Sequence, residues 1–372
     1  MNNTVTILCS GFGLGFYVPG LLIERKLHAL GIKAETEVFE SLMADDKRRM
    51  TDNSRKAYQQ NFSVALGSQK IPGDIRNSLD LAEVQSLFER WRSEGRQHFI
   101  ALSGHWVHIL DLFREAADYP VYADLLYVDS DLSPSWKNLR KLNPGYAEPY
   151  REVSMYDREN KNVLWRLDVE GLMPLPYTAR NGRLVVHGGG WGIGTFRQKI
   201  DEMEAAGYEL DISAYSVDEI GEDTGGRRYY MIDPEWRTWL RDSGGTHTFP
   251  RFGRVSRSEQ HFQACAEYGQ GLYGIIRQSA AIISKPGGGT LLDSLSSATP
   301  LVLLEPFGPH EKINSDIWES LGFGIRYDRW RDSGFAAEPL QQLARNLMQA
   351  RERYPDYIAS YAERLYAMEG RE

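Results

Sequence analysis

The sequence predicts an α/β protein built from two doubly wound, Rossmann-like domains that face a common cleft. An apolar strand, a glycine-rich turn and a helix follow one another at residues 4–30, and the same order returns at residues 183–206. Alternation of strands and helices is typical of parallel sheets covered by helices. A chain of 372 residues is also long enough for two domains with separate cores.

The elements of the first half are read from short apolar runs separated by turn residues. The glycine turn at residues 11–15 lies between the first strand and the first helix. Two later runs contain no charged residue, as expected of strands buried in a parallel sheet. We therefore expect strands at 4–10, 34–39, 99–102 and 125–128, and helices from about 19 to 30 and from about 105 to 117.

The second half repeats this order, and a linker precedes it. Pro174, Pro176 and the pair Asn181-Gly182 interrupt the chain there. We expect an N-terminal domain over residues 1–175 and a C-terminal domain over residues 182–353. The elements expected in the second half are a strand at 183–187, a glycine turn at 188–194, a helix at 195–206 and a strand at 208–212. Residues 146–166 and 218–252 are rich in charge, Tyr, Trp and Gly, and we assign them no structure.

The composition argues against several classes of protein. A net charge of -8 does not suit a general nucleic-acid binder, which presents a basic face. Cys9 and Cys265 are the only cysteines, so no disulfide framework exists and a reducing cytoplasm is expected. No signal peptide opens the sequence, and no apolar run reaches transmembrane length. We expect a cytoplasmic protein.

Residues 282–293 are the most informative stretch, because an apolar strand there ends in a glycine turn and a helix opens at Thr290. Glycines let a ligand approach the backbone, and the first amides of a helix suit a diphosphate. Lys285 adds a charge-assisted contact, and Asp293 can accept hydrogen bonds from a ribose diol. The alternatives are that Lys285 faces solvent and that Asp293 only complements the helix dipole. The candidates for nucleotide binding are Lys285, Gly287, Gly288, Gly289, Thr290 and Asp293.

The same stretch carries a family resemblance. Lys-Pro-Gly-Gly-x-Thr, an acidic residue three positions after the Thr, a Pro-containing strand and then Gly-x-x-Glu-x-x-Asn resemble the donor half of GT-B glycosyltransferases. Within this class, the chain resembles the family 28 enzymes, the diacylglycerol glycosyltransferases and the peptidoglycan lipid-intermediate N-acetylglucosaminyltransferase. The resemblance is strong over residues 280–325 and weaker over residues 183–211 and 1–40.

The resemblance implies transfer of a sugar from a nucleotide sugar, UDP-linked, to an acceptor hydroxyl, with inversion, no metal and no other cofactor. It also implies that the C-terminal helix, residues 354–372, packs back on the first domain. The implied donor contacts are Gly189, Gly190 and Gly192 for the phosphates and His310, Glu311 and Asn314 for the sugar. The family often has Gln where this chain has His310. Capping of a helix start is the alternative for these last three residues.

The catalytic base has no obvious candidate in the first glycine turn. Family members often place a His there, but the corresponding residue is Phe16, which cannot take a proton. His105 and His108 are the nearest alternatives, and His105 directly follows a buried strand at the carboxyl edge of the predicted sheet. Its ordinary pKa suits a general base near neutral pH. A structural or capping role for His105 stays open.

Asp129 is the second candidate for a catalytic role. The sequence Asp129-Ser130-Asp131 after an apolar strand resembles the Asp-x-Asp metal site of the other glycosyltransferase class, GT-A. The same spacing suits a turn and a helix cap before Pro134. We do not favour a metal, because Lys285 and the start of the helix already compensate the negative charge of a diphosphate.

Two other functions stay open: a catalytically silent, nucleotide-binding glycosyltransferase-like subunit, and a GT-B enzyme for another nucleotide-sugar reaction such as epimerisation. The acceptor is a small molecule or a lipid. The acidic charge and the many aromatic residues favour a small one. The basic residues of segment 47–56 can form a solvated helix face or touch a membrane surface, and we favour the first.

Overall fold

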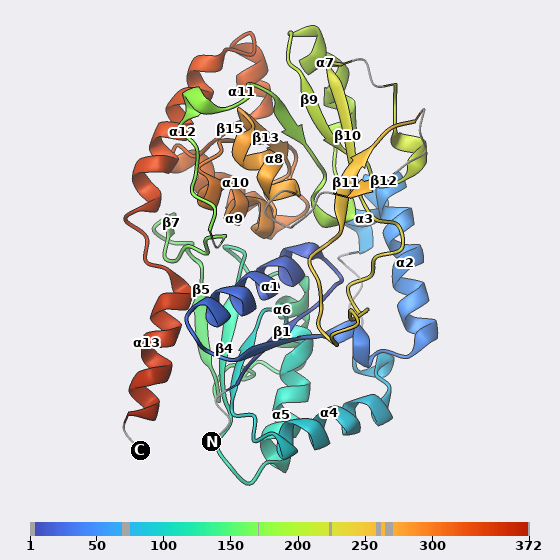
Figure 1. Ribbon diagram of the computed structural model, residues 1–372, viewed down its shortest axis with the longest axis vertical. Helices are drawn as coiled ribbons and strands as arrows, with labels where there is room; N and C mark the ends of the chain where they lie inside the picture. Colours follow the sequence, from blue (N-terminus) through green and yellow to red (C-terminus); the bar gives the residue numbers. More distant parts are fainter. Residues whose placement is uncertain are drawn as a thin grey trace.

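The computed structural model describes residues 4–68, 75–169, 171–222, 225–257, 262–264 and 271–370. In these residues, each half of the chain forms one large sheet, and helices surround both sheets (Figure 1). Helix α1 (Leu14–Ala29) lies between the two halves, near the middle of the view. The predicted class, an α/β protein with two Rossmann-like units, is confirmed.

The described strands of the first sheet are all parallel and have the order β2-β1-β3-β4-β5. This is the flavodoxin-like order of a doubly wound domain, and it reverses between β1 and β3. The strands are β1 (Val5–Cys9), β2 (Ala34–Val38), β3 (His98–Ala101), β4 (Tyr122–Tyr127) and β5 (Arg151–Ser154). The other helices of this half are α2 (Asp45–Gln60), α3 (Phe62–Ser68), α4 (Leu81–Ser93), α5 (Val107–Ala116) and α6 (Pro134–Leu142).

The second sheet contains the order β10-β9-β8-β13-β14-β15, which matches the dinucleotide-binding order 3-2-1-4-5-6. Two antiparallel strands, β11 and β12, extend it beside β10. A short hairpin of β6 (Tyr156–Asp157) and β7 (Asn162–Val163) precedes this half. The strands are β8 (Leu184–Val186), β9 (Leu210–Ser213), β10 (Arg227–Ile232), β11 (Phe252–Val255), β12 (Phe262–Ala264), β13 (Ala281–Ser284), β14 (Leu301–Leu303) and β15 (Gly324–Arg326). The helices are α7 (Ile200–Ala205), α8 (Leu272–Gln278), α9 (Gly288–Ser297), α10 (Pro309–Ser320), α11 (Tyr327–Asp332) and α12 (Ala337–Arg351).

Two helix starts in the glycine-turn units differ from the prediction. Helix α1 begins at Leu14, and Pro19 lies inside it. The start expected from the sequence was near Pro19. Gly13 instead takes the extended backbone of an N-cap, with φ -155° and ψ 134°. Helix α9 begins at Gly288 rather than Thr290, so two of the three glycines belong to its first turn.

The helix expected at residues 195–206 is also shorter than predicted. A turn of 3₁₀ helix at Phe196–Lys199 comes first, and α7 follows. Thr195 precedes this turn but does not cap it, because its hydroxyl donates to Glu305 at the end of β14.

The C-terminal helix α13 (Tyr357–Glu369) packs on the first half, although it follows the helices of the second (Figure 1). Tyr357 OH donates a hydrogen bond of 3.0 Å to Asp124 Oδ2 on β4, and Arg364 donates one of 2.6 Å to the same atom. One apolar core joins side chains of α13, both sheets and helices α1 and α9. The two halves are thus firmly connected; the exact domain limits stay a prediction.

A segment of the second half, residues 233–251 between β10 and β11, reaches across to the first half, and we call it the strap (Figure 1, gold). Tyr17 OH on α1 donates a hydrogen bond of 2.7 Å to Thr248 O of the strap. Arg241 Nη2 of the strap donates one of 2.8 Å to Glu37 Oε2 on β2. The strap therefore connects helix α1 and the first sheet to the second half.

Candidate functional site

Ligands of doubly wound sheets bind at the carboxyl ends of the strands, where the strand order reverses. In the second sheet this point lies between β8 and β13. The second glycine turn follows β8, and Lys285 with the third glycine turn follows β13. The fold therefore brings the two candidate segments for phosphate binding to one edge of one sheet.

Lys285 lies where these two turns meet. A Cβ atom built on Gly189 would lie 3.7 Å from Lys285 Nζ, and one built on Gly287 would lie 3.2 Å from it. Because neither residue has a side chain, the two backbones flank the ammonium group closely. Nζ forms an ion pair with Glu311 and lies 5.8 Å from the ring centroid of Phe307. Glu311 therefore balances the charge of Lys285 in this structure.

The second glycine turn depends on backbone angles that favour glycine. Gly189 and Gly192 have φ values of 70° and 67°, in the left-handed region. Tyr215, beyond the end of β9, holds the turn at two points: its hydroxyl accepts a hydrogen bond of 3.0 Å from Gly188 N and donates one of 2.5 Å to Gly189 O. Our sequence reasoning missed Tyr215, because only the fold brings it to the turn.

His187, the last residue before this turn, is a second buried group that our sequence reasoning missed. Its Nδ1 accepts a hydrogen bond of 3.1 Å from Gly189 N, so its proton lies on Nε2. That Nε2 is buried and has no hydrogen-bond partner in the described part of the chain. Burial, together with the nearby charge of Lys285, lowers the pKa of His187 to about 4. The sequence does place His187 between an apolar strand and a glycine turn, and this position could have marked it as a candidate site residue.

The start of α9 lies against the first half. A Cβ atom built on Gly288 would lie 2.7 Å from Val128 O, and one built on Gly289 would lie 3.3 Å from Gly15 Cα of α1. Gly190 of the second glycine turn also lies against α1, since its added Cβ would lie 2.5 Å from Leu14 Cβ. The sequence-predicted glycines Gly190, Gly288 and Gly289 therefore let the two halves approach each other closely in this conformation.

Asp293 lies in α9, and Thr290, also a predicted contact, is buried in the same helix. The Asp293 carboxylate is half-buried and has no hydrogen-bond or ion-pair partner among the described residues. Burial raises the pKa of Asp293 to about 7. An unpaired carboxylate in this position is able to accept hydrogen bonds from a ligand hydroxyl.

The three residues that the resemblance implied for the sugar lie on α10 and are all buried. Glu311 pairs with Lys285, and its Oε2 accepts a hydrogen bond of 2.6 Å from Phe307 N. Asn314 Nδ2 donates to Asp129 Oδ1 at 2.9 Å and to Pro286 O at 2.8 Å. Asn314 is thus fully engaged between the halves. Among these three residues, His310 and Glu311 lie on the first turn of α10, and Glu311 contacts Lys285.

Asp129 and Asp131, the alternative metal pair, have different partners. Asp129 accepts its hydrogen bond from Asn314, whereas Asp131 forms ion pairs with Lys137 at 2.8 Å and Arg158 at 3.0 Å. The two carboxylates therefore do not share one ligand position in this structure. Among the described residues, no group of three or more His, Cys, Asp and Glu side chains has the arrangement of a metal site.

His105 lies at the switch point of the first sheet, where the chain leaves β3. Its ring packs against Phe12 and Phe39, each with 5.2 Å between ring centroids. Its Nδ1 is buried without a hydrogen-bond partner in the described residues, and burial lowers its pKa to about 4. Of the two catalytic candidates, Asp129 contacts the donor-half residues directly, while the ring contacts of His105 lie within the first half.

Glu40, just beyond β2, holds the first glycine turn. Its two carboxylate oxygens accept hydrogen bonds of 2.9 Å from Ser10 Oγ and 2.7 Å from Gly11 N. Burial raises the pKa of Glu40, and these hydrogen bonds oppose that shift. An acidic residue after the second strand often binds a ribose in dinucleotide-binding domains. Here the carboxylate shapes the turn instead.

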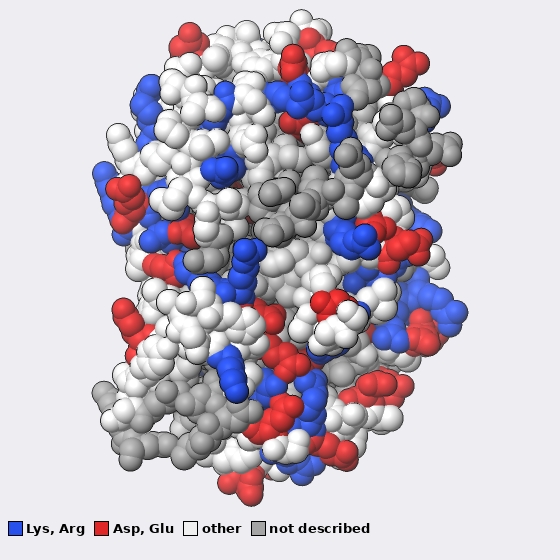
Figure 2. Space-filling view, in the orientation of Figure 1, with Lys and Arg blue, Asp and Glu red and all other residues white. Residues whose placement is uncertain are grey.

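The basic residues of α2 are interleaved with acidic ones (Figure 2). Lys47 lies 3.4 Å from Asp46, and Arg48 forms an ion pair with Asp45. These pairs fit the solvated helix face that we favoured. None of the described helices is both long enough and apolar enough to cross a membrane.

Comparison with solved structures finds this fold along nearly the whole chain in glycosyltransferases. SnogD from Streptomyces nogalater is 14% identical, with a TM-score of 0.55 and 99% of each chain covered. VinC, solved in complex with dTDP, is 12% identical, with a TM-score of 0.56 over 99% of this chain and 100% of that one. MurG of Acinetobacter baumannii is 10% identical, with a TM-score of 0.52 over 97% and 98%. Family models and curated protein sequences give no match. The chain therefore has the GT-B fold of nucleotide-sugar glycosyltransferases.

Proposed function

We propose that this protein transfers a sugar from a nucleoside diphosphate sugar to an acceptor hydroxyl, with inversion at the anomeric carbon. The observation that carries the proposal is the convergence of two glycine turns on Lys285, at the switch point of the second sheet. We propose a pyrimidine nucleotide, UDP or dTDP, as the donor. One structure with this fold is a dTDP complex, which supports this choice.

In this proposal the diphosphate lies beside Lys285 and the backbone of Gly189 and Gly287. The ammonium group stabilises the negative charge that develops on the diphosphate as its bond to the anomeric carbon breaks. Asp293 accepts hydrogen bonds from the ribose, and His310 with Glu311 faces the sugar. Lys285 and the amides of the turns compensate the negative charge of the diphosphate, so the scheme requires no metal. The acceptor hydroxyl gives its proton to His105 or Asp129 as it attacks.

Thermal unfolding with a panel of nucleotides and nucleotide sugars in EDTA tests this function. A ligand at about a hundred times its Kd stabilises the domain that binds it by roughly 2.7 kcal/mol, which gives a measurable rise in Tm. We expect stabilisation by UDP or dTDP and by one of their sugars. Stabilisation only after Mn²⁺ or Mg²⁺ is restored would move the diphosphate to Asp129 and Asp131. No response to any nucleotide would contradict a donor site.

Lys285→Ala tests the position of the site. We expect the variant to fold, since Lys285 lies at a strand end, and to bind nucleotide at least about tenfold more weakly after loss of a charge-assisted contact. Lys312→Ala is the matched control, because this exposed lysine of α10 pairs with Asp316 and with no other acidic residue that the structure describes. Equal affinity of both variants would remove Lys285 from the site. Release of free nucleotide in the presence of an acceptor then separates a transferase from a silent subunit.

A further inference from the structure

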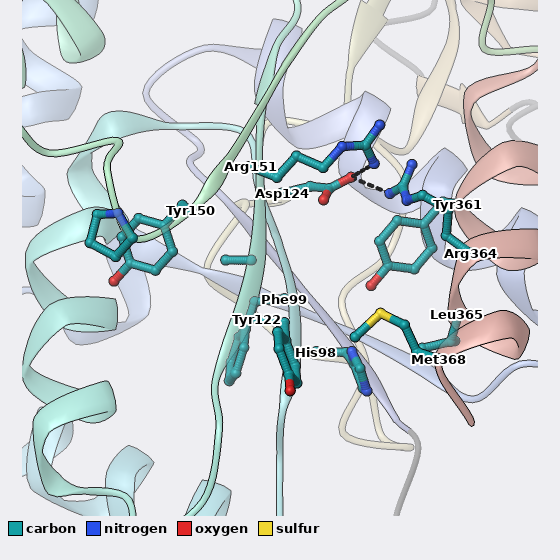
Figure 3. Close-up of a pocket in the computed structure, with 12 residues that line it drawn as sticks. His98, Phe99, Tyr122, Asp124, Tyr150, Arg151, Tyr361, Arg364, Leu365 and Met368 are labelled. Carbon is teal, nitrogen blue, oxygen red and sulfur yellow. Dashed lines mark hydrogen bonds and ion pairs between the residues drawn. The ribbon is translucent and has the colours of Figure 1, made fainter. Parts of the chain in front are cut away.

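A cavity of about 180 Å³ lies away from the candidate donor site, between α13 and the first sheet (Figure 3). Its sheet side comes from the first residues of β3, β4 and β5, whereas His105 and Asp129 lie beyond the opposite ends of these strands. The cavity therefore occupies the amino edge of the sheet. It belongs to neither glycine turn.

One end of this cavity is cationic. Arg151 on β5 and Arg364 on α13 approach Asp124 from two sides (Figure 3). Their guanidinium groups lie 3.4 Å and 2.6 Å from the same oxygen, Asp124 Oδ2, which also accepts a hydrogen bond from Tyr357. One carboxylate thus faces two guanidinium groups, and the ion cluster keeps a surplus positive charge.

Arg364 is incompletely satisfied. Its Nη1 is buried and has no hydrogen-bond partner in the described residues. A buried donor without a partner costs free energy, and a guanidinium fork binds a carboxylate through two parallel hydrogen bonds. Arg151 leaves 45% of its side chain exposed, so one of the two cations is open to a ligand. An anion at this end would compensate the surplus charge.

The rest of the cavity is aromatic and apolar. Tyr361 and Met368 of α13 stand opposite Tyr122 and His98, whose rings stack with 5.6 Å between centroids and 17° between planes (Figure 3). Tyr122 and Met368 are 45% and 41% exposed, which is high for large apolar side chains that line one cavity. A dry apolar cavity of about 150 Å³ is enough to bind benzene. The cavity therefore has room for one ring.

We propose that this cavity binds a small aromatic carboxylate. Its ring lies among Tyr122, Tyr361 and Met368, and its carboxylate lies beside Arg151 and Arg364. Such a ligand touches α13 and three strands of the first sheet at once, so it strengthens the attachment of the C-terminal helix. This inference does not depend on the proposed glycosyl transfer, because none of these residues belongs to the donor or acceptor machinery.

Calorimetric titration of the full chain with benzoate tests the proposal, with benzamide and inorganic phosphate as probes of the two halves of the ligand. For a ligand of this size we expect a Kd of about 1 mM for benzoate. Benzamide has the ring without the charge, and phosphate has the charge without the ring. Both should bind at least about tenfold more weakly. Equal binding of benzamide would overturn the role of the arginines, and equal binding of phosphate would overturn the role of the ring.

Two variants locate the site. Arg364→Met removes the incompletely paired cation, and Met368→Trp fills the apolar end without a change of charge; each should weaken benzoate binding at least about tenfold. Arg353→Met is the matched control, because Arg353 is exposed and lies outside the cavity. Met368 lies on an exposed turn near the end of α13, so we expect Met368→Trp to fold. This variant therefore remains informative even if Arg364→Met unfolds. Unchanged binding in Met368→Trp, or absence of benzoate binding to the unmodified protein at 10 times the expected Kd (~10 mM), would overturn the proposal.

Discussion

The side-chain amide of Asn314 joins the two halves of the protein through Asp129, to which it donates a hydrogen bond of 2.9 Å. The same amide accepts a hydrogen bond of 2.9 Å from Ser130 N and donates one to Pro286 O. Asp129 and Ser130 follow β4 of the first sheet, whereas Pro286 and Asn314 belong to the donor half. One fully buried side chain therefore fixes the carboxyl edge of the first sheet against the third glycine turn.

Asn314→Ala should destabilise the protein by about 2 kcal/mol or more, because it leaves several buried donors and acceptors without partners. Urea unfolding followed by tryptophan fluorescence measures the loss. Asn160→Ala is the control: among the described residues its exposed side-chain amide bonds to Asp157 alone, and exposed substitutions usually change stability by less than about 0.5 kcal/mol. An equal effect of both variants would show that the Asn314 contact does not hold the halves together.

Gly11→Ala should dislodge the strap from the first glycine turn. A Cβ atom at residue 11 would lie 2.0 Å from Thr238 Oγ1 and 2.5 Å from Thr238 Cβ, so the strap has to move. We expect faster hydrogen exchange across residues 233–251, where Tyr17 and Glu37 now hold the segment. Gly13→Ala is the matched control, because its added Cβ meets no atom of the described residues within 4 Å.

Thr238→Gly provides a second check, since it removes the side chain that a Cβ at residue 11 would meet. In the double variant, the exchange rates of the strap should return toward those of Thr238→Gly alone. If Gly11→Ala leaves the exchange of the strap unchanged, the close approach of Thr238 is not a constraint.

The local pattern of the sequence was sufficient to predict the two strand, glycine turn and helix units and the fold class. It was also sufficient to predict that Lys285 and Asp293 lie near a glycine turn, because both residues are only a few positions from its glycines in the sequence. The start of α1 was predicted wrongly near Pro19. Leu14 and Gly15 already belong to the helix and lie against Gly190 and Gly289 of the donor half, a contact between distant residues that the local sequence does not show.

Contacts between distant residues could not be predicted in the same way. The strap lacks strand or helix periodicity, and its partners Tyr17 and Glu37 are 231 and 204 positions away. Tyr215 and Glu40 hold the glycine turns only because the sheets bring neighbouring strand ends together. The sequence likewise gave no sign that Asn314 would bond to Asp129, which depends on how the halves pack.

Asp293→Asn should change the dependence of stability on pH. Burial raises the pKa of Asp293 to about 7, above its unfolded value of about 3.9, so the folded state holds the proton more tightly. Stability is therefore lost as pH rises between these two values. We expect Asp293→Asn to be more stable than the unmodified protein by at least about 1 kcal/mol at pH 8, and equally stable near pH 3.5.

Chemical unfolding at several pH values measures this difference. Asp328→Asn, which removes an exposed carboxylate of α11, is the control for the loss of one negative charge. A constant difference for Asp293→Asn would contradict a half-buried carboxylate whose pKa is raised. Nucleotide affinity of the same variant tests the ribose contact separately, because Asn cannot accept two hydrogen bonds through charged oxygens.

His105→Ala should slow sugar transfer by roughly a hundredfold or more, without a change in nucleotide affinity, if this histidine takes the proton of the acceptor. Burial lowers the pKa of His105 to about 4, so the ring stays neutral and able to accept a proton down to about pH 5. The rate of the unmodified protein should therefore be flat between about pH 6 and 8, where an ordinary histidine would titrate. His108→Ala tests the other histidine candidate, and it should leave the rate nearly unchanged if His105 is the base.

Asp129→Asn distinguishes the two candidate bases, because Asn keeps the size of the side chain and removes its basic carboxylate. If His105 is the base, this variant should retain most of the transfer rate and lose only the charged partner of Asn314. A loss of roughly a hundredfold or more in Asp129→Asn, with a near-normal rate in His105→Ala, would instead make Asp129 the base. That result would fit the geometry in one respect, since Asp129 is the candidate that touches the donor half directly. It would leave His105 as a half-buried ring that packs against Phe12 and Phe39.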